Sequence, residues 1–220
     1  MDKEILNKLI RVVGSDNIIL NKSEMSKYLI EWRGVYTGKA GAIIKPKSTK
    51  EVSKILKIAY STNTPIISQG GNTGLVGGQI SFDDNHIVLN LTRLNKVREI
   101  NTLDKSITVE SGLTLLELQN VCKKNNTLFP LSLASEGTCT IGGNISTNAG
   151  GVGVLYYGNT RNLVLGLEIV TPEGKIINTL STLIKDNTGY SLKDLFIGSE
   201  GTLGVITAAT LKVFPLPKEK

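Results

Sequence analysis

The sequence predicts an α+β fold with mixed and antiparallel sheets rather than a regular doubly wound sheet. Two observations lead to this prediction. Capped helix patterns are interspersed with short apolar strand patterns along the whole chain. Residues 171–174 carry the Pro and Gly of a tight turn between two such strand patterns, and strands joined so closely pair in antiparallel fashion.

The first half of the chain is predicted to form a helix and then a strand–helix–strand unit. The opening helix places apolar side chains such as Leu6 and Leu9 on one face, and Gly14 follows as its stop. The next helix is expected to open with a capping box, because Ser48 is followed three residues later by Glu51. The predicted elements are a helix at 2–13, a strand at 41–44, a helix from 48, and a strand at 65–67.

The second half continues with more strand patterns than helix patterns. Thr114 and Glu117 form a second capping box, which opens a helix that turns Leu118 and Cys122 inward. The turn at 171–174 predicts a hairpin. In order, strands are predicted at 86–90, 106–110, 163–170, 175–178 and 205–214, and the last of them ends at Pro215.

Length, charge and hydrophobicity restrict the kinds of protein that this chain can be. The chain of 220 residues is long enough for one large domain or two small lobes. Its net charge of +6 is dispersed without any basic block, which suits a small phosphate- or carboxylate-bearing ligand and argues against a nucleic-acid partner. No apolar run approaches the ~20 residues of a transmembrane helix, and the first residues do not form a secretory signal.

The two cysteines predict no disulfide and no metal site. Cys122 and Cys139 are too few and too far apart for a disulfide scaffold or a CxxC motif. Reduced thiols are typical of cytosolic proteins, so the sequence predicts a cytoplasmic location.

Three glycine-rich segments carry the chemistry. Five glycines fall within residues 69–78, directly after a predicted strand, where bare peptide N–H groups could form a nest for a phosphate; a flexible surface loop is the alternative. Residues 137–151 repeat this pattern and carry no charged side chain after Gly137, and residues 198–204 form a third loop. Two anion-binding loops imply a long ligand. Neither a G-x-G-x-x-G motif after a strand nor a complete Walker A loop is present.

These loops resemble a known family. Residues 69–78, the Asn148-Ala149-Gly150-Gly151 motif with Tyr157-Gly158 after it, and residues 201–207 are similar, in the same order, to signatures of the flavin-binding domain shared by vanillyl-alcohol oxidase and p-cresol methylhydroxylase. The branch that is most similar contains the D-2-hydroxyglutarate, D-lactate and glycolate dehydrogenases. The resemblance extends from about Tyr28 to Pro217.

The resemblance implies a domain at 37–217 after a helical segment at 1–36, with lobes at about 37–100 and 101–217, and FAD extended between them. It implies that the pyrophosphate is held by the first loop, through Gln69, Gly70, Gly71, Asn72, Thr73, Gly74, Leu75 and Gly78. The flavin would contact Pro130, Leu131, Gly137, Thr140, Gly143, Asn144, Ser146, Thr147 and Gly151, with Glu200, Gly201 and Ile206 closing the adenosine or flavin side. We expect Gly71 and Gly74 to be needed both for close approach of the pyrophosphate and for positive φ.

Two departures from the family bear on function. Some members tether the flavin through a histidine in the first loop, but this chain has Asn72 there, so FAD is expected to be non-covalent; the lone His86 is expected to begin a later strand. Relatives continue into a C-terminal domain that binds the 2-hydroxy acid and supplies a base, and no residue in this chain is an evident base.

The sequence therefore predicts an FAD-dependent oxidoreductase acting on a D-2-hydroxy acid, with its substrate domain absent. The alternatives are a stand-alone FAD-binding module that pairs with another chain, or a flavoprotein similar to UDP-N-acetylenolpyruvylglucosamine reductase, whose loop pattern matches residues 70–78 less well.

Overall fold

The computed structural model describes residues 2–217, and its first sheet is mixed. The sheet has four strands in the order β1-β2-β4-β3. The central strand β4 pairs in parallel with β2 and β3, whereas β1 pairs antiparallel with β2. The strands are β1 (Ile18–Ile19), β2 (Ala42–Ile44), β3 (Ile66–Gln69) and β4 (Ile87–Asn90).

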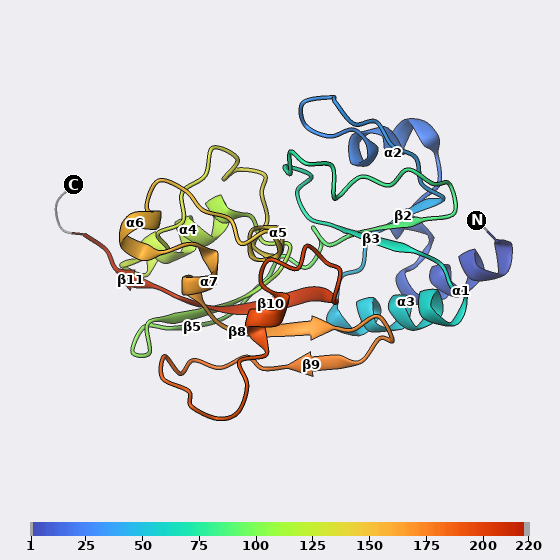
Figure 1. Ribbon diagram of the computed structural model, residues 1–220. Coiled ribbons are helices and arrows are strands. Elements are labelled where there is room, and N and C mark those ends of the chain that lie inside the picture. The colour runs from blue at the N-terminus through green and yellow to red at the C-terminus, as the bar shows by residue number, and fades with distance from the viewer. Residues whose placement is uncertain (1, 218–220) are drawn as a thin grey trace.

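Helices cover both faces of this sheet (Figure 1). Alternate side chains of a strand point to opposite faces. Ala42 and Ile44 accordingly pack against α1 (Lys3–Val13) and α3 (Thr49–Ser61), while Ile43 packs against α2 (Lys22–Leu29). A short 3-10 turn, η1 (Ser15–Asn17), links α1 to β1.

The second sheet is antiparallel throughout. It has five strands in the order β5-β6-β10-β8-β9. The predicted hairpin is confirmed as β8 and β9, and β6 has the predicted bounds. The strands are β5 (Val97–Asn101), β6 (Ser106–Glu110), β8 (Val164–Val170), β9 (Ile176–Asn178) and β10 (Val205–Lys212).

The prediction of one final strand at 205–214 is wrong at its end. β10 stops at Lys212 because neither neighbouring strand extends further. Lys212 is paired with Ser106, the first residue of β6, and Leu211 is paired with Val164, the first residue of β8. The chain then forms β11 (Phe214–Pro215), which pairs with β7 (Thr127–Leu128) in a separate two-stranded sheet.

Most helices of the second lobe bury apolar side chains in one cluster with strands of its sheet. The longest is α4 (Leu115–Lys124), where the predicted capping box of Thr114 and Glu117 is confirmed. By contrast, the box at Ser48 is only half formed, because the Glu51 carboxylate accepts from the Lys47 N–H instead of that of Ser48. The shorter helices are α5 (Ile141–Ser146), α6 (Val154–Tyr157), α7 (Thr160–Leu163) and α8 (Lys193–Phe196).

The glycine-rich segment at 137–151 is not the continuous loop that the sequence suggested, because α5 lies within it. Glycine disfavours a helix interior by about 1 kcal/mol relative to alanine. Tertiary packing overrides this preference: Ile141 and Ile145 are buried in the core of the second lobe, and a Cβ on Gly142 would come within 2.6 Å of the Cβ of Ser111. Glycine at 142 therefore lets α5 pack directly on the end of β6.

The helix α3 joins the lobes. Val52, Ile55 and Leu56 of α3 share one apolar cluster with Val170 of β8 and Val205 of β10. In addition, the Ser53 hydroxyl donates to the Gly174 carbonyl in the turn between β8 and β9. The first-lobe helix is thus packed onto the strands of the second lobe.

Candidate cofactor site

A cleft lies where the glycine segment after β3 meets α5 and the loop before β10. It encloses about 1120 Å³ of empty space, part of it open to solvent. Many of the predicted site residues line it, from all three segments. They are Gln69, Gly70, Gly71, Asn72, Thr73, Gly74, Gly78, Thr140, Gly143, Asn144, Ser146, Thr147, Glu200 and Ile206.

The backbone N–H groups of the first glycine segment have no hydrogen-bond partners in the described chain, although several of its carbonyls accept hydrogen bonds. Among the described residues, no backbone N–H from Gly70 to Gln79 donates to a backbone or side-chain acceptor. Most peptide N–H groups of folded proteins that are shielded from solvent are paired. A run of unpaired donors along a cleft is suited to a ligand with several anionic oxygens.

The glycines at the start of this segment permit close contact between the two lobes. A Cβ on Gly70 would overlap the hydroxyl of Thr140, and one on Gly71 would overlap the carbonyl oxygen of Thr138. The expectation that Gly71 and Gly74 require positive φ is wrong, because the positive φ angles of the segment are 56° at Asn72 and 79° at Gly77. Asparagine tolerates this conformation better than other side chains.

Two polar side chains of this segment hold the loop itself. The amide of Gln69 is buried, donates to the carbonyls of Tyr28 and Gln79, and accepts from Asn90. The Asn72 amide donates to the Lys27 and Ile30 carbonyls, while its oxygen is buried without a partner in the described chain. These side chains fasten the loop to α2 and β4, and they leave the backbone facing the cleft.

The third loop is fastened to α5. Gly198 donates its N–H to the Ile145 carbonyl at 3.1 Å, and Glu200 donates its N–H to the Ser146 carbonyl at 2.9 Å. This geometry sets the carboxylate of Glu200, a residue at a φ of 51°, beside Gly78: a Cβ on Gly78 would lie 3.4 Å from Glu200 Oε2. Among the described residues that line the cleft, Glu200 is the only one with an ionisable side chain.

Six predicted site residues do not line the cleft. Leu75 and Gly137 are exposed, and Leu131 is buried in the core next to Pro130. A Cβ on Gly151 would overlap the Ser132 carbonyl, so this glycine serves backbone packing. Gly201 lines a neighbouring hollow beside Tyr60 and Pro172.

Sequence reasoning missed several residues that do line the cleft, and strand ends could have revealed some of them. Leu91 and Ser111 each follow the last residue of a strand, β4 and β6, and residues just beyond strands often form sites in α/β proteins. Ser111 is buried, and its hydroxyl has no partner in the described chain. The other missed residues are Ser68, Val76, Gln79, Leu133, Ser135, Gly142, Ala149, Gly204 and Val205.

Comparison with known proteins identifies the class. A family described as "FAD binding domain" matches residues 40–180, which is more than half of the chain. The chain belongs to this family, and its cofactor is FAD. The structure agrees with this assignment, since the unpaired N–H groups and the orphaned Ser111 hydroxyl lie where a long anionic ligand needs donors.

The chain is also similar to part of several curated dehydrogenases and related enzymes, judged by the share of each that it covers. Zebrafish mitochondrial D-2-hydroxyglutarate dehydrogenase is 44% identical over 86% of this chain and 35% of the relative. The D-2-hydroxyglutarate–pyruvate transhydrogenase of Saccharomyces cerevisiae is 38% identical over 99% of this chain and 44% of the relative. A putative mitochondrial D-lactate dehydrogenase of Schizosaccharomyces pombe is 42% identical over 89% of this chain and 38% of the relative. The chain thus spans less than half the length of each of these relatives.

Solved structures confirm the α+β fold. Alkyldihydroxyacetonephosphate synthase superposes over 100% of this chain and 41% of its own, with a TM-score of 0.87 and 24% identity. Berberine bridge enzyme superposes over 98% of this chain and 44% of its own, with a TM-score of 0.81 and 23% identity. At these identities the likeness concerns the fold alone.

The prediction of a cytoplasmic location is wrong. The relatives from rice, zebrafish and fission yeast are all named as mitochondrial proteins. The prediction relied on two free thiols and on the lack of a secretory signal, and neither feature speaks against an organelle whose targeting segments are amphipathic rather than apolar. Within residues 2–217, no helix is both long and apolar enough to span a bilayer.

Proposed function

We propose that this chain is the FAD-binding part of a flavin-dependent dehydrogenase of small D-2-hydroxy acids, such as D-2-hydroxyglutarate, D-lactate or glycolate. The observation that carries the proposal is the set of unpaired N–H groups between Gly70 and Gln79, most of which belong to residues that line the inter-lobe cleft. The names of the relatives support the class of substrate. When bound, FAD supplies an acceptor for the hydride that leaves the hydroxyl-bearing carbon.

The chain's own residues are assigned to binding and orientation. The unpaired backbone donors of the first glycine segment bind the phosphate oxygens, where charge-assisted hydrogen bonds are strongest. Thr140, Asn144, Ser146 and Thr147 offer uncharged polar groups on the opposite wall, and Ile206 with Val205 covers an apolar part of the ligand. Glycine at 78 and 143 keeps these walls open, since a Cβ there would meet little of the protein.

We further propose that the cofactor is held without a covalent bond. Position 72 carries an amide, which is not nucleophilic, and this amide is already engaged with α2. His86 precedes β4 and is not among the described residues that line the cleft. Acid precipitation of FAD-loaded protein should therefore release all flavin into the supernatant; flavin retained in the pellet would contradict this part of the proposal.

The domain at 37–217, with a helical segment at 1–36 before it, is proposed to need a further domain or a partner chain for catalysis. Removal of the hydroxyl proton requires a base within hydrogen-bond reach of the substrate. Of the described residues that line the cleft, only Glu200 is ionisable, and its backbone is committed to fixing the third loop. Substrate recognition and the base are accordingly assigned outside this chain.

The test is titration of the purified protein with FAD. We expect saturable binding with flavin bands that shift from those of free FAD, and a rise in thermal stability as ligand binds the folded state. Absence of binding after thorough removal of bound nucleotides would overturn the proposed function. FMN, which lacks the adenosine and one of the two phosphates of FAD, is the matched control and should bind more weakly.

A further inference from the structure

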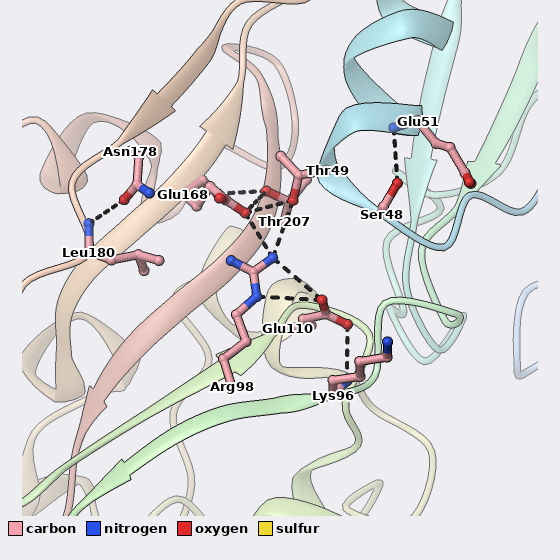
Figure 2. A network of polar contacts seen from close by, with 10 residues as sticks. All are labelled: Ser48, Thr49, Glu51, Lys96, Arg98, Glu110, Glu168, Asn178, Leu180 and Thr207. Carbon is pink, nitrogen blue, oxygen red and sulfur yellow. Dashed lines mark hydrogen bonds and ion pairs between the residues drawn. The ribbon is translucent and has the colours of Figure 1, made fainter. Parts of the chain in front are cut away.

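An ionic cluster joins strands of the second sheet to the first lobe. We define the Arg98 cluster as Thr49, Arg98, Glu110, Glu168 and Thr207 (Figure 2). Arg98 on β5 donates from Nη2 to Oε1 of Glu168 at 3.0 Å, and from Nε and Nη2 to Oε1 of Glu110 at 3.4 Å. Both carboxylates are buried, whereas the Arg98 side chain retains 29% exposure.

The Glu168 carboxylate is the centre of the cluster. Its Oε1 also accepts from the Thr49 hydroxyl at 2.6 Å and from the Thr207 hydroxyl at 2.9 Å. Thr49 is the first residue of α3, so one carboxylate oxygen binds donors from β5, from β10 and from the first-lobe helix. Burial alone would raise the pKa of Glu168, but the hydrogen bonds from Arg98, Thr49 and Thr207 and the charge of Arg98 hold this pKa below its ordinary value.

Two of these donors come from irregular positions in their strands. The pairing of β5 with β6 passes from Val97 to Glu99 with a shift of register, which leaves Arg98 as an extra residue. The pairing of β10 with β8 shifts in the same way between Ile206 and Ala208, which leaves Thr207 as an extra residue. A β-bulge re-aims neighbouring side chains and bends its strand. Both bulges are held by the same carboxylate.

The cluster directly adjoins the cofactor cleft. Ile206, which lines the cleft, immediately precedes the bulge at Thr207. Ser111, which also lines it, follows Glu110 and donates its N–H to the Thr207 carbonyl at 3.0 Å. On the other side, Thr49 begins the helix that leads through β3 into the first glycine segment. The cleft residues at the end of β6 and the start of β10 thus directly follow or precede cluster residues, whereas the first glycine segment is connected to the cluster through α3 and β3.

Stability alone does not explain such a cluster. Burying two carboxylates costs solvation free energy, and apolar residues of similar volume often stabilise a core equally well or better. Apolar contacts are not directional. The hydrogen bonds of an arginine guanidinium are, and they fix the relative positions of its acceptors. Here the acceptors lie on β6 and β8 on either side of Ala208, which is paired with both Glu110 and Glu168.

We infer that Arg98 is a positioning residue for the cofactor cleft, which acts through Glu168 to fix the bulge at Thr207 and the placement of α3 against the second sheet. The inference rests on the proposed function for the identity of the ligand, which is FAD. Arg98 itself does not line the cleft and acts only through the geometry of its partners.

The test separates positioning from stability with three variants. Arg98→Met leaves two unpaired buried carboxylates and should lower both thermal stability and FAD affinity. The triple variant Arg98→Met, Glu110→Gln, Glu168→Gln removes the unpaired charges and should regain much of the stability, yet it should still bind FAD about 2- to 30-fold more weakly than wild type, the range expected for networks of this kind. Leu118→Ala, on the buried face of α4, is the control and should lower stability without changing FAD affinity.

A second measurement does not depend on FAD. Spin labels placed by Val76→Cys and Thr202→Cys lie on exposed residues of the first glycine segment and the third loop, and both native cysteines are buried. The distance distribution between the labels should be wider in the triple variant than in wild type. Failure of wild type to bind FAD would refute the proposed function. Identical distance distributions, or an affinity in the triple variant equal to that of wild type, would refute the positioning role.

Discussion

At the scale of single residues, Gly142 and Gly143 are neighbours in α5 with opposite surroundings. A Cβ on Gly142 would come within 2.6 Å of the Ser111 Cβ, whereas a Cβ on Gly143 would meet only the Thr140 hydroxyl at 3.4 Å. Both residues line the cleft, but only at Gly143 is there space for an added methyl group. We therefore expect Gly143→Ala to raise the stability of the apo protein by up to ~1 kcal/mol through helix propensity while lowering FAD affinity. Gly142→Ala should lower the stability instead.

Chemical denaturation of the apo proteins and FAD titration of each folded variant check this pair. An unchanged FAD affinity in Gly143→Ala would show that the wall formed by α5 does not approach the ligand. Both variants add the same methyl group at adjacent positions. A difference between them in stability or in FAD affinity therefore reflects the different surroundings of the two glycines.

The single histidine provides a second test at this scale. His86 lies just before β4, and its Nδ1 is buried without a partner in the described chain. Because it does not line the cleft, His86→Ala should leave the amount of bound FAD unchanged, as measured from the fluorescence of the acid-released flavin. A marked loss of flavin from folded His86→Ala protein would place the histidine in the cofactor site after all.

At the scale of elements, sequence patterns predicted what depends on local chemistry. The Thr114 capping box and the hairpin of β8 and β9 were predicted from neighbouring residues, and both are confirmed. α5 was missed because its two adjacent glycines argue against a helix, and only contact with Ser111 and burial of Ile141 favour one. The bulges at Arg98 and Thr207 were likewise invisible, since they depend on a carboxylate that lies far away in sequence.

The Glu168 carboxylate, which links β8 to β5, β10 and α3, should make the stability of the fold depend on pH. The folded-state pKa of Glu168 lies below its ordinary value of 4.5. A carboxylate of this kind stabilises the fold above the unfolded-state pKa, and that contribution is lost as the pH falls through the folded-state pKa. We expect the difference in unfolding free energy between wild type and Glu168→Gln to shrink as the pH is lowered below about 4.5.

Denaturant unfolding at a series of acidic pH values measures that difference. Taking the difference between the two proteins cancels the contributions of other carboxylates with lowered pKa values, such as Asp194, which forms an ion pair with Arg161. A difference that stays constant between neutral and strongly acidic pH would show that Glu168 is not ionised in the folded protein.

At the scale of the whole molecule, the resemblance of the glycine segments to a flavin-binding family predicted that they would share one ligand site, and the structure brings residues of all three to one cleft. The sequence could not show how the segments are held. Gln69 was predicted to bind phosphate, but its amide is used to fasten the loop to Tyr28 and Asn90. Ser111 was missed because a lone serine after a strand has no distinctive pattern until the strand order is known.

The composition of the cleft leads to a prediction for the isolated chain. Residues 1–220 should bind FAD but should not oxidise D-lactate, D-2-hydroxyglutarate or glycolate measurably with an artificial electron acceptor. Orienting a substrate against a catalytic group can lower a barrier by about 7 to 11 kcal/mol. A general base adds about 10²- to 10⁴-fold. Among the described residues, the cleft offers neither a cationic side chain for a substrate carboxylate nor any ionisable group besides Glu200.

A dye-reduction assay on FAD-saturated protein tests this, with free FAD as the background and with the C-terminal part of the zebrafish relative added in a parallel sample. Activity that appears only when the C-terminal part is added would support the proposal that this chain binds the flavin and that a separate domain binds the 2-hydroxy acid. Robust turnover by the chain alone would require a base within it. Glu200→Gln would then be the first variant to assay, because Glu200 is the one carboxylate among the described residues that line the cleft, and glutamine preserves its shape while removing its basicity.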